Sequence, residues 1–411
     1  MSVDSAQMSA GSGTDGVPSE VRDGYEVHSA ALRRGLDVVL YPRQVMMVVG
    51  GDGTPGDTEL AFVHGIPRSS TLGSVTYAQD KRMRRAMLER AELPLPRGAT
   101  FSVGRGIRDA KNFAERIGYP VVVKPAMGDN AIETFPDVQG EEQLDAAIDY
   151  LMTPPTERET FVRAAYALTE LREPGEEEGR IVVPPGYRFL IEEHVRGDYV
   201  RFLVVDGLVR SVVHCPGPPA VTAGEAGRDI LGEVHPTMQQ LAIDAVQALP
   251  GLGVAAVDMV VTDYQRPAAD QGVWIVELSE RPGLAVQADL SEDLSQHLGD
   301  VILDHGAEVG GLPLNVAQDD VAVEFHAEAI PDLDGAVTAL AETAREFGLT
   351  GHIGVTDRVE GVAEGFVQGS ARHIARLSEM LLDGRLKEHR AMLVEERQQA
   401  RQTLDSFVVR T

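Results

Sequence analysis

Two carboxylates lie in apolar segments of this 411-residue chain. Asp258 lies in AAVDMVV and Glu277 in VWIVELSERPG, and both segments have the composition of buried strands. A carboxylate in a buried strand is costly unless it is paired with a cation or bound to a metal ion. Two of them on neighbouring strands indicate a divalent cation site, where oxygen ligands favour Mg²⁺ or Mn²⁺. Structural carboxylates held in ion pairs are the alternative interpretation.

Lysine is rare in this chain, and two of its lysines stand where phosphate could bind. Of the 37 basic residues, 33 are arginines and only four are lysines, which are Lys81, Lys111, Lys124 and Lys387. Lys124 ends the apolar run YPVVVK and precedes the turn AMGDN, so a point charge and backbone amides lie together, as a phosphate contact needs. Lys81 lies in AQDKRMRRAML, which reads as a helix. These features follow one another along the chain: first the helix lysine, then the strand lysine, then a strand that ends in Glu-Glu, and last the two strands with carboxylates.

Composition excludes several classes of partner. The formal net charge is -27, from 37 Lys plus Arg against 64 Asp plus Glu, and such a field repels nucleic acids and acidic membrane surfaces. The single cysteine, Cys215, excludes an intramolecular disulfide and a multi-cysteine zinc site, and it reads as a small buried hydrophobe. The first residues carry Asp4 and no apolar run, unlike a signal peptide. We therefore expect a cytoplasmic protein that binds neither nucleic acid nor a membrane.

Periodicity and turn residues predict mixed α and β structure around the chemical motifs. Helices are expected over 77–92, 107–117, 140–152 and 236–249. Strands are expected over 120–124, 131–135, 187–195, 198–206, 208–214, 254–261 and 273–279. Asp206-Gly207 is a strong hairpin signal between two of these strands. Residues 154–186, rich in Pro and Glu, are expected to form an exposed excursion.

The same pattern divides the chain into five parts. Residues 1–24 are rich in Ser, Gly and Asp, and we expect them to be disordered. Residues 25–75 are expected to form a short α/β domain, and 76–312 the main domain. Residues 320–384 read as strand, helix, strand, strand and helix, and 385–411 as a charged terminal helix.

The succession of motifs resembles the ATP-grasp superfamily, particularly its cyanophycin-synthetase-like and D-alanine ligase branches. The resemblance covers residues 70–290 and rests on SSTLGSVTYAQDKRMRRAML, GYPVVVKPAMGDNAIET, FLIEEHVRGDYVRFLVV, VDMVV and VELSERPG. It implies an α+β class with an ATP-grasp fold, in which two α+β subdomains enclose ATP. The domain over 25–75 would be the short pre-ATP-grasp domain of such proteins.

The resemblance implies a nucleotide site. Lys81 and Lys124 would contact the phosphates, together with the phosphate loop that contains Gly128. The residues implied for the adenine pocket are Glu192, Glu193 and Val195. The ribose carboxylate of the family aligns with Tyr199, while Asp198 stands one place earlier, and a shift of one residue in a strand reverses the side chain.

It also implies a metal site and catalytic groups. The magnesium ligands would be Asp258, Glu277 and Ser279, which stands where the family usually has asparagine. His214 and Cys215 occupy the region of a family arginine that contacts phosphate, so Arg201, Arg210 or Arg228 would supply that charge, and His214 is either structural or catalytic. Arg281 would bind a substrate carboxylate or acyl phosphate, with a surface role as the alternative. The implied catalytic residues are Lys124, Arg201 and Arg281.

Residues 320–384 resemble a second family, the ferredoxin-like acylphosphatase domains of order βαββαβ. The resemblance is clearest from LTGHIG through VAEGFVQGSARHIARL. The first loop lacks the phosphate-binding arginine of that family, and its asparagine is replaced near Val355, so we expect no hydrolysis there. Packing, formation of a homo-oligomer and shaping of the substrate pocket are left open as its roles.

Together these features predict an ATP-dependent ligase that joins a small amino-acid-like or peptide carboxylate to an amine through an acyl phosphate, in specialised biosynthesis. Ala256 stands where the D-alanine ligase branch has an arginine, which disfavours D-alanine ligation. The tandem ligase domain of cyanophycin synthetase is not recognised, which disfavours synthesis of a storage polymer. The alternatives are an ATP-grasp phosphotransferase and a nucleotide-binding regulatory protein that has lost its chemistry.

Overall fold

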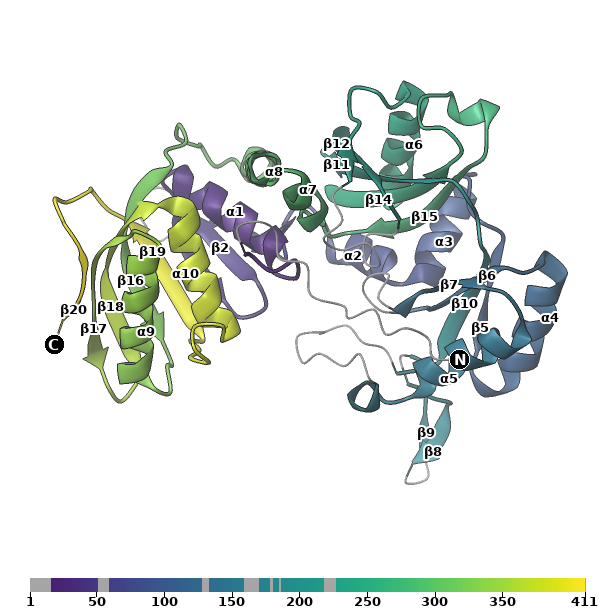
Figure 1. Cartoon of the computed structure of the whole chain (residues 1–411), viewed down its shortest axis with the longest axis horizontal. Coiled ribbons are helices and arrows are strands. Elements are labelled where there is room, and N and C mark those ends of the chain that lie inside the picture. Colours follow the sequence, from purple (N-terminus) through teal and green to yellow (C-terminus); the bar gives the residue numbers. More distant parts are fainter. Residues whose placement is uncertain are drawn as a thin grey trace. The chain divides into compact units, whose positions relative to one another are not determined.

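The computed structural model of the chain describes residues 16–50, 59–127, 133–158, 170–177, 180–184, 186–217 and 227–410. These residues fall into two compact units (Figure 1). The first unit comprises Thr71–Glu280, and the second combines residues up to Ser70 with those from Arg281 onward. No helix among the described residues is long and apolar enough to cross a membrane.

A four-stranded sheet forms one half of the first unit, with strand order β5-β10-β6-β7. Its strands are β5 (Gly98–Ser102), β6 (Val121–Pro125), β7 (Phe135–Val138) and β10 (Arg188–Glu193). Two helices cover it, α4 (Ile107–Ile117) and α5 (Glu141–Met152). Val123 and Ile191 pack with Ala114 and Leu144 of these helices in one core. Because side chains alternate along a strand, Lys124, which follows Val123 in β6, lies on the opposite face of the sheet.

A five-stranded sheet forms the other half, with order β13-β12-β11-β14-β15. Its strands are β11 (Asp198–Val205), β12 (Leu208–Cys215), β13 (Arg228–Asp229), β14 (Val254–Val261) and β15 (Val273–Ser279). One face packs on α6 (Pro236–Gln247), where Phe202 and Met259 share a core with Met238. The predicted hairpin joins β11 to β12, and Asp206 and Gly207 both have positive φ, as a type I′ turn requires.

The helix predicted over 77–92 is divided in two. The segments are α2 (Leu72–Gln79) and α3 (Lys81–Arg90), and Asp80 between them has extended backbone. The carboxylate of Asp80 accepts a hydrogen bond from the Arg82 amide at 2.9 Å and so caps α3. This break makes Lys81 the first residue of α3, and its amide donates to the carbonyl of Ala126, just after β6, at 3.0 Å.

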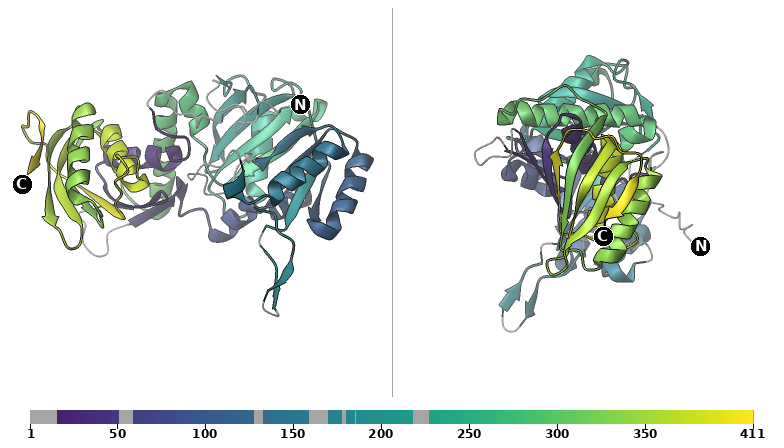
Figure 2. Two further views of the ribbon diagram at one scale, coloured as in Figure 1. Left: turned by 60° about the horizontal axis from the view of Figure 1, so that its bottom comes forward. Right: turned by 90° about the vertical axis from the view of Figure 1, so that its left-hand side faces the viewer.

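Part of the expected excursion over 154–186 forms a small hairpin of its own. Its strands are β8 (Gly175–Glu177) and β9 (Arg180–Val182), which pair only with each other among the described strands. Figure 2 shows this hairpin projecting from the first unit. Ile181 is strongly exposed there, in agreement with the expectation of an exposed segment.

A nine-stranded sheet forms the second unit, with order β20-β17-β18-β16-β19-β1-β2-β3-β4. Its first strands are β1 (Asp37–Tyr41), β2 (Val45–Val49), β3 (Glu59–Val63) and β4 (Ile66–Pro67). The others are β16 (Asp320–Glu328), β17 (Thr350–Asp357), β18 (Val362–Ser370), β19 (Leu393–Gln398) and β20 (Phe407–Arg410). The helices are α1 (Arg22–Arg33), α7 (Ala285–Leu290), α8 (Glu292–Gly310), α9 (Leu333–Glu346) and α10 (Ala371–Asp383).

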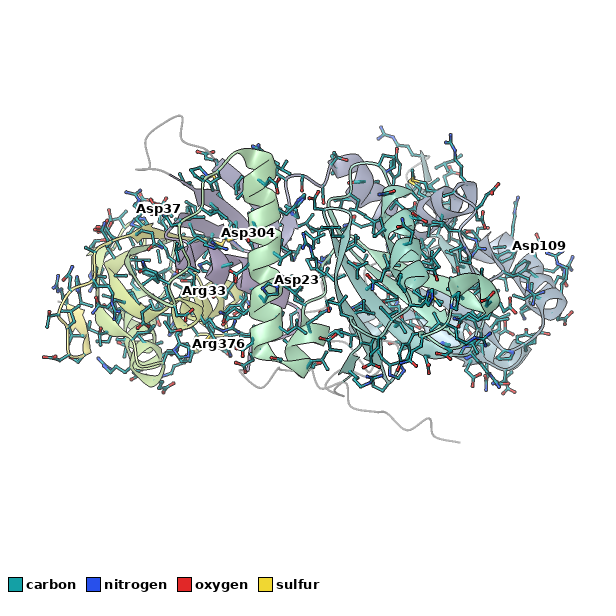
Figure 3. All side chains as sticks on the ribbon, turned by 90° about the horizontal axis from the view of Figure 1, so that it is seen from above. Asp23, Arg33, Asp37, Asp109, Asp304 and Arg376 are labelled. Carbon is teal, nitrogen blue, oxygen red and sulfur yellow. The ribbon has the colours of Figure 1, made fainter. Side chains whose placement is uncertain are left out.

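Helix α1 links the early and late segments of this second unit. The carboxylate of Asp23 accepts hydrogen bonds from the amides of Leu284 at 2.7 Å and Gly283 at 3.2 Å, while Arg33 donates to Asp300 at 2.6 Å. Figure 3 labels Asp23 and Arg33, the two residues of α1 that make these contacts. This arrangement differs from the predicted division, in which 25–75 stood alone and 76–312 included α7 and α8. It also makes residues 22–24 helical, although 1–24 were expected to be disordered, and residues 1–15 lie outside the described part.

The terminal helix predicted over 385–411 is not formed. Its place is taken by β19, which pairs with both β1 and β16, and by β20, which pairs in parallel with β17. The residues of β19 alternate, so Val394 and Glu396 face the helices while Glu395 faces outward. The charged local sequence favoured a helix, but pairing with strands far away in the chain determines the outcome.

A buried polar cluster lies where α1, α10 and β19 meet. Nε2 of His28 lies 2.5 Å from Oε2 of Glu396, and the Ser378 hydroxyl donates to Oε1 at 2.5 Å. Glu379 is buried beside them. Burial raises the pKa of Glu379 to about 7, despite the opposing effect of the nearby His28. The protonated form of this carboxyl is therefore the one that suits the folded protein.

Replacing Glu379 with Gln is expected to stabilise the second unit above neutral pH. Because the folded-state pKa is raised, Glu379 contributes most stability below its unfolded value near 4.5, and loses it as pH rises toward 7. Glu379→Gln should thus unfold at a higher temperature than the natural protein at about pH 8, with a gain of about 1–3 kcal/mol, and show little difference near pH 4.5. Calorimetric melting at both pH values measures this, with exposed Glu346→Gln as control. A gain of equal size at both pH values would contradict the assignment.

Candidate functional site

Side chains from α3 and from both sheets meet at a small pocket in the first unit. Its lining includes Lys81, Arg84, Lys124, Glu192 and Glu277. The ammonium group of Lys124 donates to the carbonyl of Val276 at 3.3 Å, which joins β6 to β15. Four of the residues that the sequence predicts for nucleotide and metal therefore line one pocket, and these are Lys81, Lys124, Glu192 and Glu277.

Glu192 is held between two cations on the first sheet. Its Oε2 atom lies 2.5 Å from Nζ of Lys124, and its Oε1 atom accepts a hydrogen bond from Arg85 at 3.0 Å. Lys124 stands opposite Leu190 in the register of β6 and β10, so Lys124 and Glu192 extend from the same face. All three side chains are largely buried, which strengthens these charge interactions relative to water.

Glu277 is paired with Arg84 of α3. The same guanidinium donates to the carbonyl of Leu278 at 2.6 Å and to that of Ala78 at 3.2 Å. Burial tends to raise the pKa of Glu277, but the charges of Arg84, Lys81 and Lys124 outweigh it and lower the pKa to about 2. Glu277 is therefore a carboxylate at neutral pH.

Asp258 is held by two residues of the neighbouring strand β11. Arg201 stands opposite it in the register and donates from Nε at 2.7 Å and from Nη2 at 2.9 Å, in a two-pronged arrangement. The Tyr199 hydroxyl donates to Oδ2 of Asp258 at 3.1 Å. Burial and the charge of Asp258 raise the pKa of Tyr199 well above its usual value, so it stays a donor.

Cys215 lies opposite Tyr199 on the same face of the second sheet. Burial, followed by the charge of Asp258, raises the pKa of its thiol to about 12. The side chain therefore stays protonated at neutral pH and is a poor nucleophile. This agrees with its interpretation as a small buried hydrophobe.

The pocket and its neighbourhood carry more positive than negative charge. The cationic side chains are Lys81, Arg84, Arg85, Lys124 and Arg201, and the carboxylates they surround are Glu192, Asp258 and Glu277. This local excess contrasts with the net charge of -27 of the whole chain. A partly buried cationic cluster is suited to the phosphate groups of a nucleotide.

Asp258 and Glu277 could bind a divalent cation only if they released the arginines that pair with them. Asp258 and Glu277 face each other across β14 and β15 and supply the hard oxygen atoms that Mg²⁺ prefers. Each is paired with an arginine, as the ion-pair interpretation of the sequence proposed. Within the described ranges, no group of three or more His, Cys, Asp or Glu side chains forms a ready metal cage. The donor chemistry therefore fits, provided that the carboxylates exchange their arginine partners for the metal.

Several predicted residues lie elsewhere on these strands. Glu193 extends from the opposite face to Glu192 and is bonded to Arg97 at 2.8 and 3.1 Å. Asp198 likewise points away from Tyr199, and its Oδ1 atom lies 3.5 Å from Nε2 of His214. The alternation of side chains along β10 and β11 accounts for both placements.

The remaining predicted residues are placed as follows. Val195 lies partly buried between β10 and β11, and Ser279 stands opposite Ala256 at the end of β15. Gly128 lies outside the described residues. Arg281 belongs to the second unit, where burial and the Arg281 charge lower the pKa of His64 to about 4.

Two pocket residues, Arg84 and Arg85, were not singled out from the sequence. Both follow Lys81 at the spacing that places side chains on one helix face, three and four residues later in KRMRR. That spacing could have identified them. The same spacing also leads from Arg85 to Glu89, which pairs with it at 2.8 Å. Their partners in the pocket, Glu192 and Glu277, could not be identified in this way, because they lie more than a hundred residues away.

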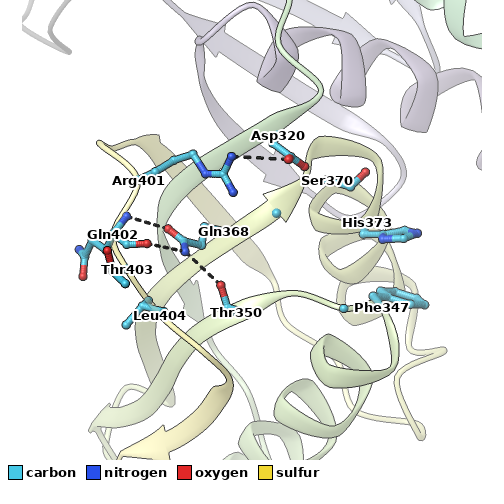
Figure 4. Close-up of a pocket in the computed structure, with 12 residues that line it drawn as sticks. Asp320, Phe347, Thr350, Gln368, Ser370, His373, Arg401, Gln402, Thr403 and Leu404 are labelled. Atoms are coloured by element: carbon cyan, nitrogen blue, oxygen red, sulfur yellow. Dashed lines mark hydrogen bonds and ion pairs between the residues drawn. The ribbon is translucent and has the colours of Figure 1, made fainter.

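A larger cavity, of about 470 Å³, lies in the second unit (Figure 4). Its floor is fixed by Gln368, whose amide donates to Thr350 at 3.0 Å and to the carbonyl of Gln402 at 2.8 Å. Its charged groups, Arg401 and Asp320, are paired with each other at 3.5 Å and are well exposed. It contains none of the residues that the sequence singles out for chemistry, so the smaller pocket is the better candidate site.

Part of the chain is similar in sequence to one protein-family model and to several curated proteins. Residues 80–131 match the family model described as the ATP-binding domain of the carbamoyl-phosphate synthase L chain. Cyanophycin synthetase of Synechocystis sp. is 24% identical over 281 residues, which are 57% of this chain and 31% of that protein. Cyanophycin synthetase of Nostoc sp. is 24% identical over 275 residues, which are 58% of this chain and 30% of that protein. The chain therefore spans about a third of the length of these curated relatives.

The comparison with solved structures also finds synthetases and ligases, with TM-scores below 0.4. D-alanine–D-alanine ligase from Bacillus anthracis, complexed with ATP, is 15% identical and covers 59% of this chain and 68% of its own, with a TM-score of 0.39. A bifunctional glutathione synthetase from Pasteurella multocida is 13% identical over 64% of this chain and 41% of its own, with a TM-score of 0.38. The matched model describes an ATP-binding domain, and the similar proteins are named as synthetases and ligases.

Removing Arg201 is expected to destabilise the first unit strongly. In Arg201→Met, Asp258 would keep a buried charge without its cation, and breaking a buried pair from one side costs about 3–5 kcal/mol. The double variant Arg201→Met/Asp258→Asn removes both charges and should recover most of that loss. Urea unfolding followed by circular dichroism measures the difference, with exposed Arg196→Met as the matched control. If the single and double variants lose equal stability, the pair is not what holds Asp258.

Proposed function

We propose that this chain, which its similarities relate to the ATP-grasp ligases, is an ATP-dependent carboxylate–amine ligase. The observation that carries the proposal is the cationic pocket of Lys81 and Lys124 beside the facing carboxylates Asp258 and Glu277. The substrate class that we propose is a small amino-acid-like or peptide acid together with an amine, in specialised biosynthesis.

The proposed reaction has two steps. A carboxylate oxygen of the acid attacks the γ-phosphorus of ATP, the bond to the β,γ-bridging oxygen breaks, and ADP leaves with an acyl phosphate as product. The amine nitrogen then attacks the acyl carbon, inorganic phosphate leaves, and the nitrogen loses a proton to give the amide. Such a sequence needs no protein nucleophile, because positioning and stabilisation of phosphoryl charge supply the catalysis.

The cationic residues would carry most of this work. Lys124 and Lys81 would bind the transferred phosphoryl and its leaving group, and their burial beside the pocket supports this role. Arg201 would stabilise the same charge once it is released from Asp258. As the sequence predicts, Arg281 would bind the substrate anion and Gly128, which lies outside the described residues, would contact phosphate. The residues proposed for adenine and ribose are Glu192, Glu193, Val195, Asp198 and Tyr199, of which Glu192 lines the pocket.

Asp258, Glu277 and Ser279 would hold Mg²⁺ or Mn²⁺. A divalent ion bound there would neutralise phosphate charge. Asp258 and Glu277 are cross-strand neighbours, and the ionised state of Glu277 supports the assignment. Ser279 would contribute a hydroxyl oxygen, with water completing the coordination.

We further propose that the segment from β16 to β19 is a ferredoxin-like domain. The element order β16, α9, β17, β18, α10, β19 supports it, as does the strand order β17-β18-β16-β19 within the larger sheet. A role in packing rather than hydrolysis is consistent with the loss of the phosphate-binding residues that the sequence indicates.

A nucleotide-binding protein without ligase chemistry is the second candidate. The observation that favours it is that both proposed metal ligands are already neutralised by arginines, Asp258 by Arg201 and Glu277 by Arg84. Nucleotide would then bind to the cationic pocket, and no ADP would form. A phosphotransferase, which would form ADP without an amine, is distinguished by the same measurement.

Formation of ADP by the purified protein is expected to require both a carboxylic acid and an amine. A panel of amino acids and dipeptides, offered alone and in pairs with ATP and Mg²⁺, identifies the active combination. Turnover that ignores the amine would indicate a phosphotransferase, and tight ATP binding with no ADP from any pair would indicate the regulatory alternative.

Lys124→Met is expected to lower this activity by about 100-fold or more, because a donor aimed at developing charge contributes that much to the rate. Lys111→Met is the matched control, since Lys111 pairs with Glu141 and Asp145 on the surface. The activities of both variants are compared under saturating ATP. Equal activity in the two variants would show that Lys124 does not contact the reacting phosphate.

A further inference from the structure

We propose that Arg84 serves as a resident cation at Glu277, so that a divalent metal binds this carboxylate only together with a polyphosphate. The inference rests on the proposed function, since it takes Glu277 as a ligand of the nucleotide's metal. It gives Arg84 a role in the site and states that the divalent metal and the nucleotide bind together.

Arg84 is held in place rather than resting on the surface. Its guanidinium pairs with Glu277 and donates to the carbonyls of Leu278 and Ala78, so it joins α3 to β15 and to α2. The side chain is only 8% exposed. A buried arginine with three partners has little freedom to leave by fluctuation alone, so Glu277 is neutralised whenever the pocket is empty of other charges.

A bare divalent ion would meet an unfavourable pocket. It would have to displace the Arg84 guanidinium from Glu277 and would lie among cations that include Lys81 and Lys124. Mg²⁺ and Mn²⁺ also give up their hydration shells reluctantly, so a single released carboxylate offers little compensation. We therefore expect weak metal binding in the absence of nucleotide.

A triphosphate reverses this balance. Its negative oxygens offer Arg84 an alternative partner and turn the local charge from positive to negative, which attracts the metal to the released Glu277. Arg84 would move from carboxylate to phosphate as the metal takes its place. Metal and nucleotide then bind cooperatively, and by linkage each strengthens the other by the same factor.

Arg201 differs from Arg84 in one useful respect. It is bonded through two nitrogens to Asp258, and its loss therefore leaves a buried charge on β14 without a cation. Glu277 keeps the nearby charges of Lys81 and Lys124 when Arg84 is replaced. The effect of Arg84 on metal binding can thus be tested without leaving Glu277 wholly unpaired.

The test measures Mn²⁺ binding to the whole chain by electron paramagnetic resonance, without nucleotide and with a nonhydrolysable ATP analogue. The natural protein should bind Mn²⁺ at least about 10-fold more tightly with the analogue. Arg84→Met should bind Mn²⁺ alone at least about 10-fold more tightly than the natural protein does, and should show weaker coupling to the analogue. Adding Glu277→Gln to Arg84→Met should abolish the gain, which locates the metal.

Two controls and one substitute variant keep the outcome decisive. Arg82→Met makes the same change on the same helix but removes a partner of Asp80, which does not line the pocket, and it should leave Mn²⁺ binding unchanged. Arg84→Lys keeps the charge and should resemble the natural protein. If circular dichroism shows that Arg84→Met does not fold, Arg84→Gln, which can still donate to a carbonyl, takes its place.

Two results would overturn the inference. One is tight Mn²⁺ binding by the natural protein in the absence of nucleotide, and the other is a folded Arg84→Met or Arg84→Gln variant with no gain in Mn²⁺ affinity. Neither depends on ligase turnover. Cooperative metal binding without ADP formation would refute the proposed function alone, and ADP formation with uncoupled Mn²⁺ binding would refute this inference alone.

Discussion

Neutralisation of buried charge is the constraint on which the interior of the first unit depends. Three carboxylates lie on the inner faces of its sheets, and each has a cation within contact distance: Lys124 for Glu192, Arg84 for Glu277 and Arg201 for Asp258. The contacts run between elements, from helix to strand and from strand to strand, so they fix the sheets relative to α3 as well as satisfying the charges. Lys81 and Arg85 add to the positive charge around the pocket, and that excess is what makes the pocket suitable for an anion.

The same alternation that builds the core also supplies the polar face. On β14, Val257 and Met259 face α6 while Asp258 faces the other way, and on β10 Ile191 faces the covering helices while Glu192 faces the pocket. Each sheet is thus covered by helices on one side and carries charged side chains on the other. A shift of one residue in either strand would exchange the two faces. The same alternation along β11 explains why Asp198, one place from Tyr199, lies beside His214 instead.

Local patterns predicted the strands of the site well, and long-range pairing was beyond them. The bounds expected for β14 and β15 agree with the structure, because their apolar runs end at clear turn residues. Lys124 and Glu277 were singled out by residue type and position, and Lys81 and Glu192 were added by the family resemblance. The structure brings all four to one pocket. The acidic partner of Arg84 lies on the distant strand β15, so its contact with Glu277 leaves no mark in the nearby sequence. For the same reason β19, whose stability comes from β1 and β16, read as a charged helix.

The position of β19 in the nine-stranded sheet has a consequence for how the chain is assembled during synthesis. His28 and Glu396, which bond in the core of the second unit, are 368 residues apart in the chain, and β1 lacks one of its neighbours until β19 has been made. Among the described residues, the first unit, by contrast, comes from the single stretch Thr71–Glu280 of the chain. Domains fold as units and contacts between distant residues form slowly. The first unit can therefore complete its fold on the ribosome before β19, the late neighbour of β1, has been synthesised. The earliest segment of the second unit is therefore among the last parts of the chain to be fully buried.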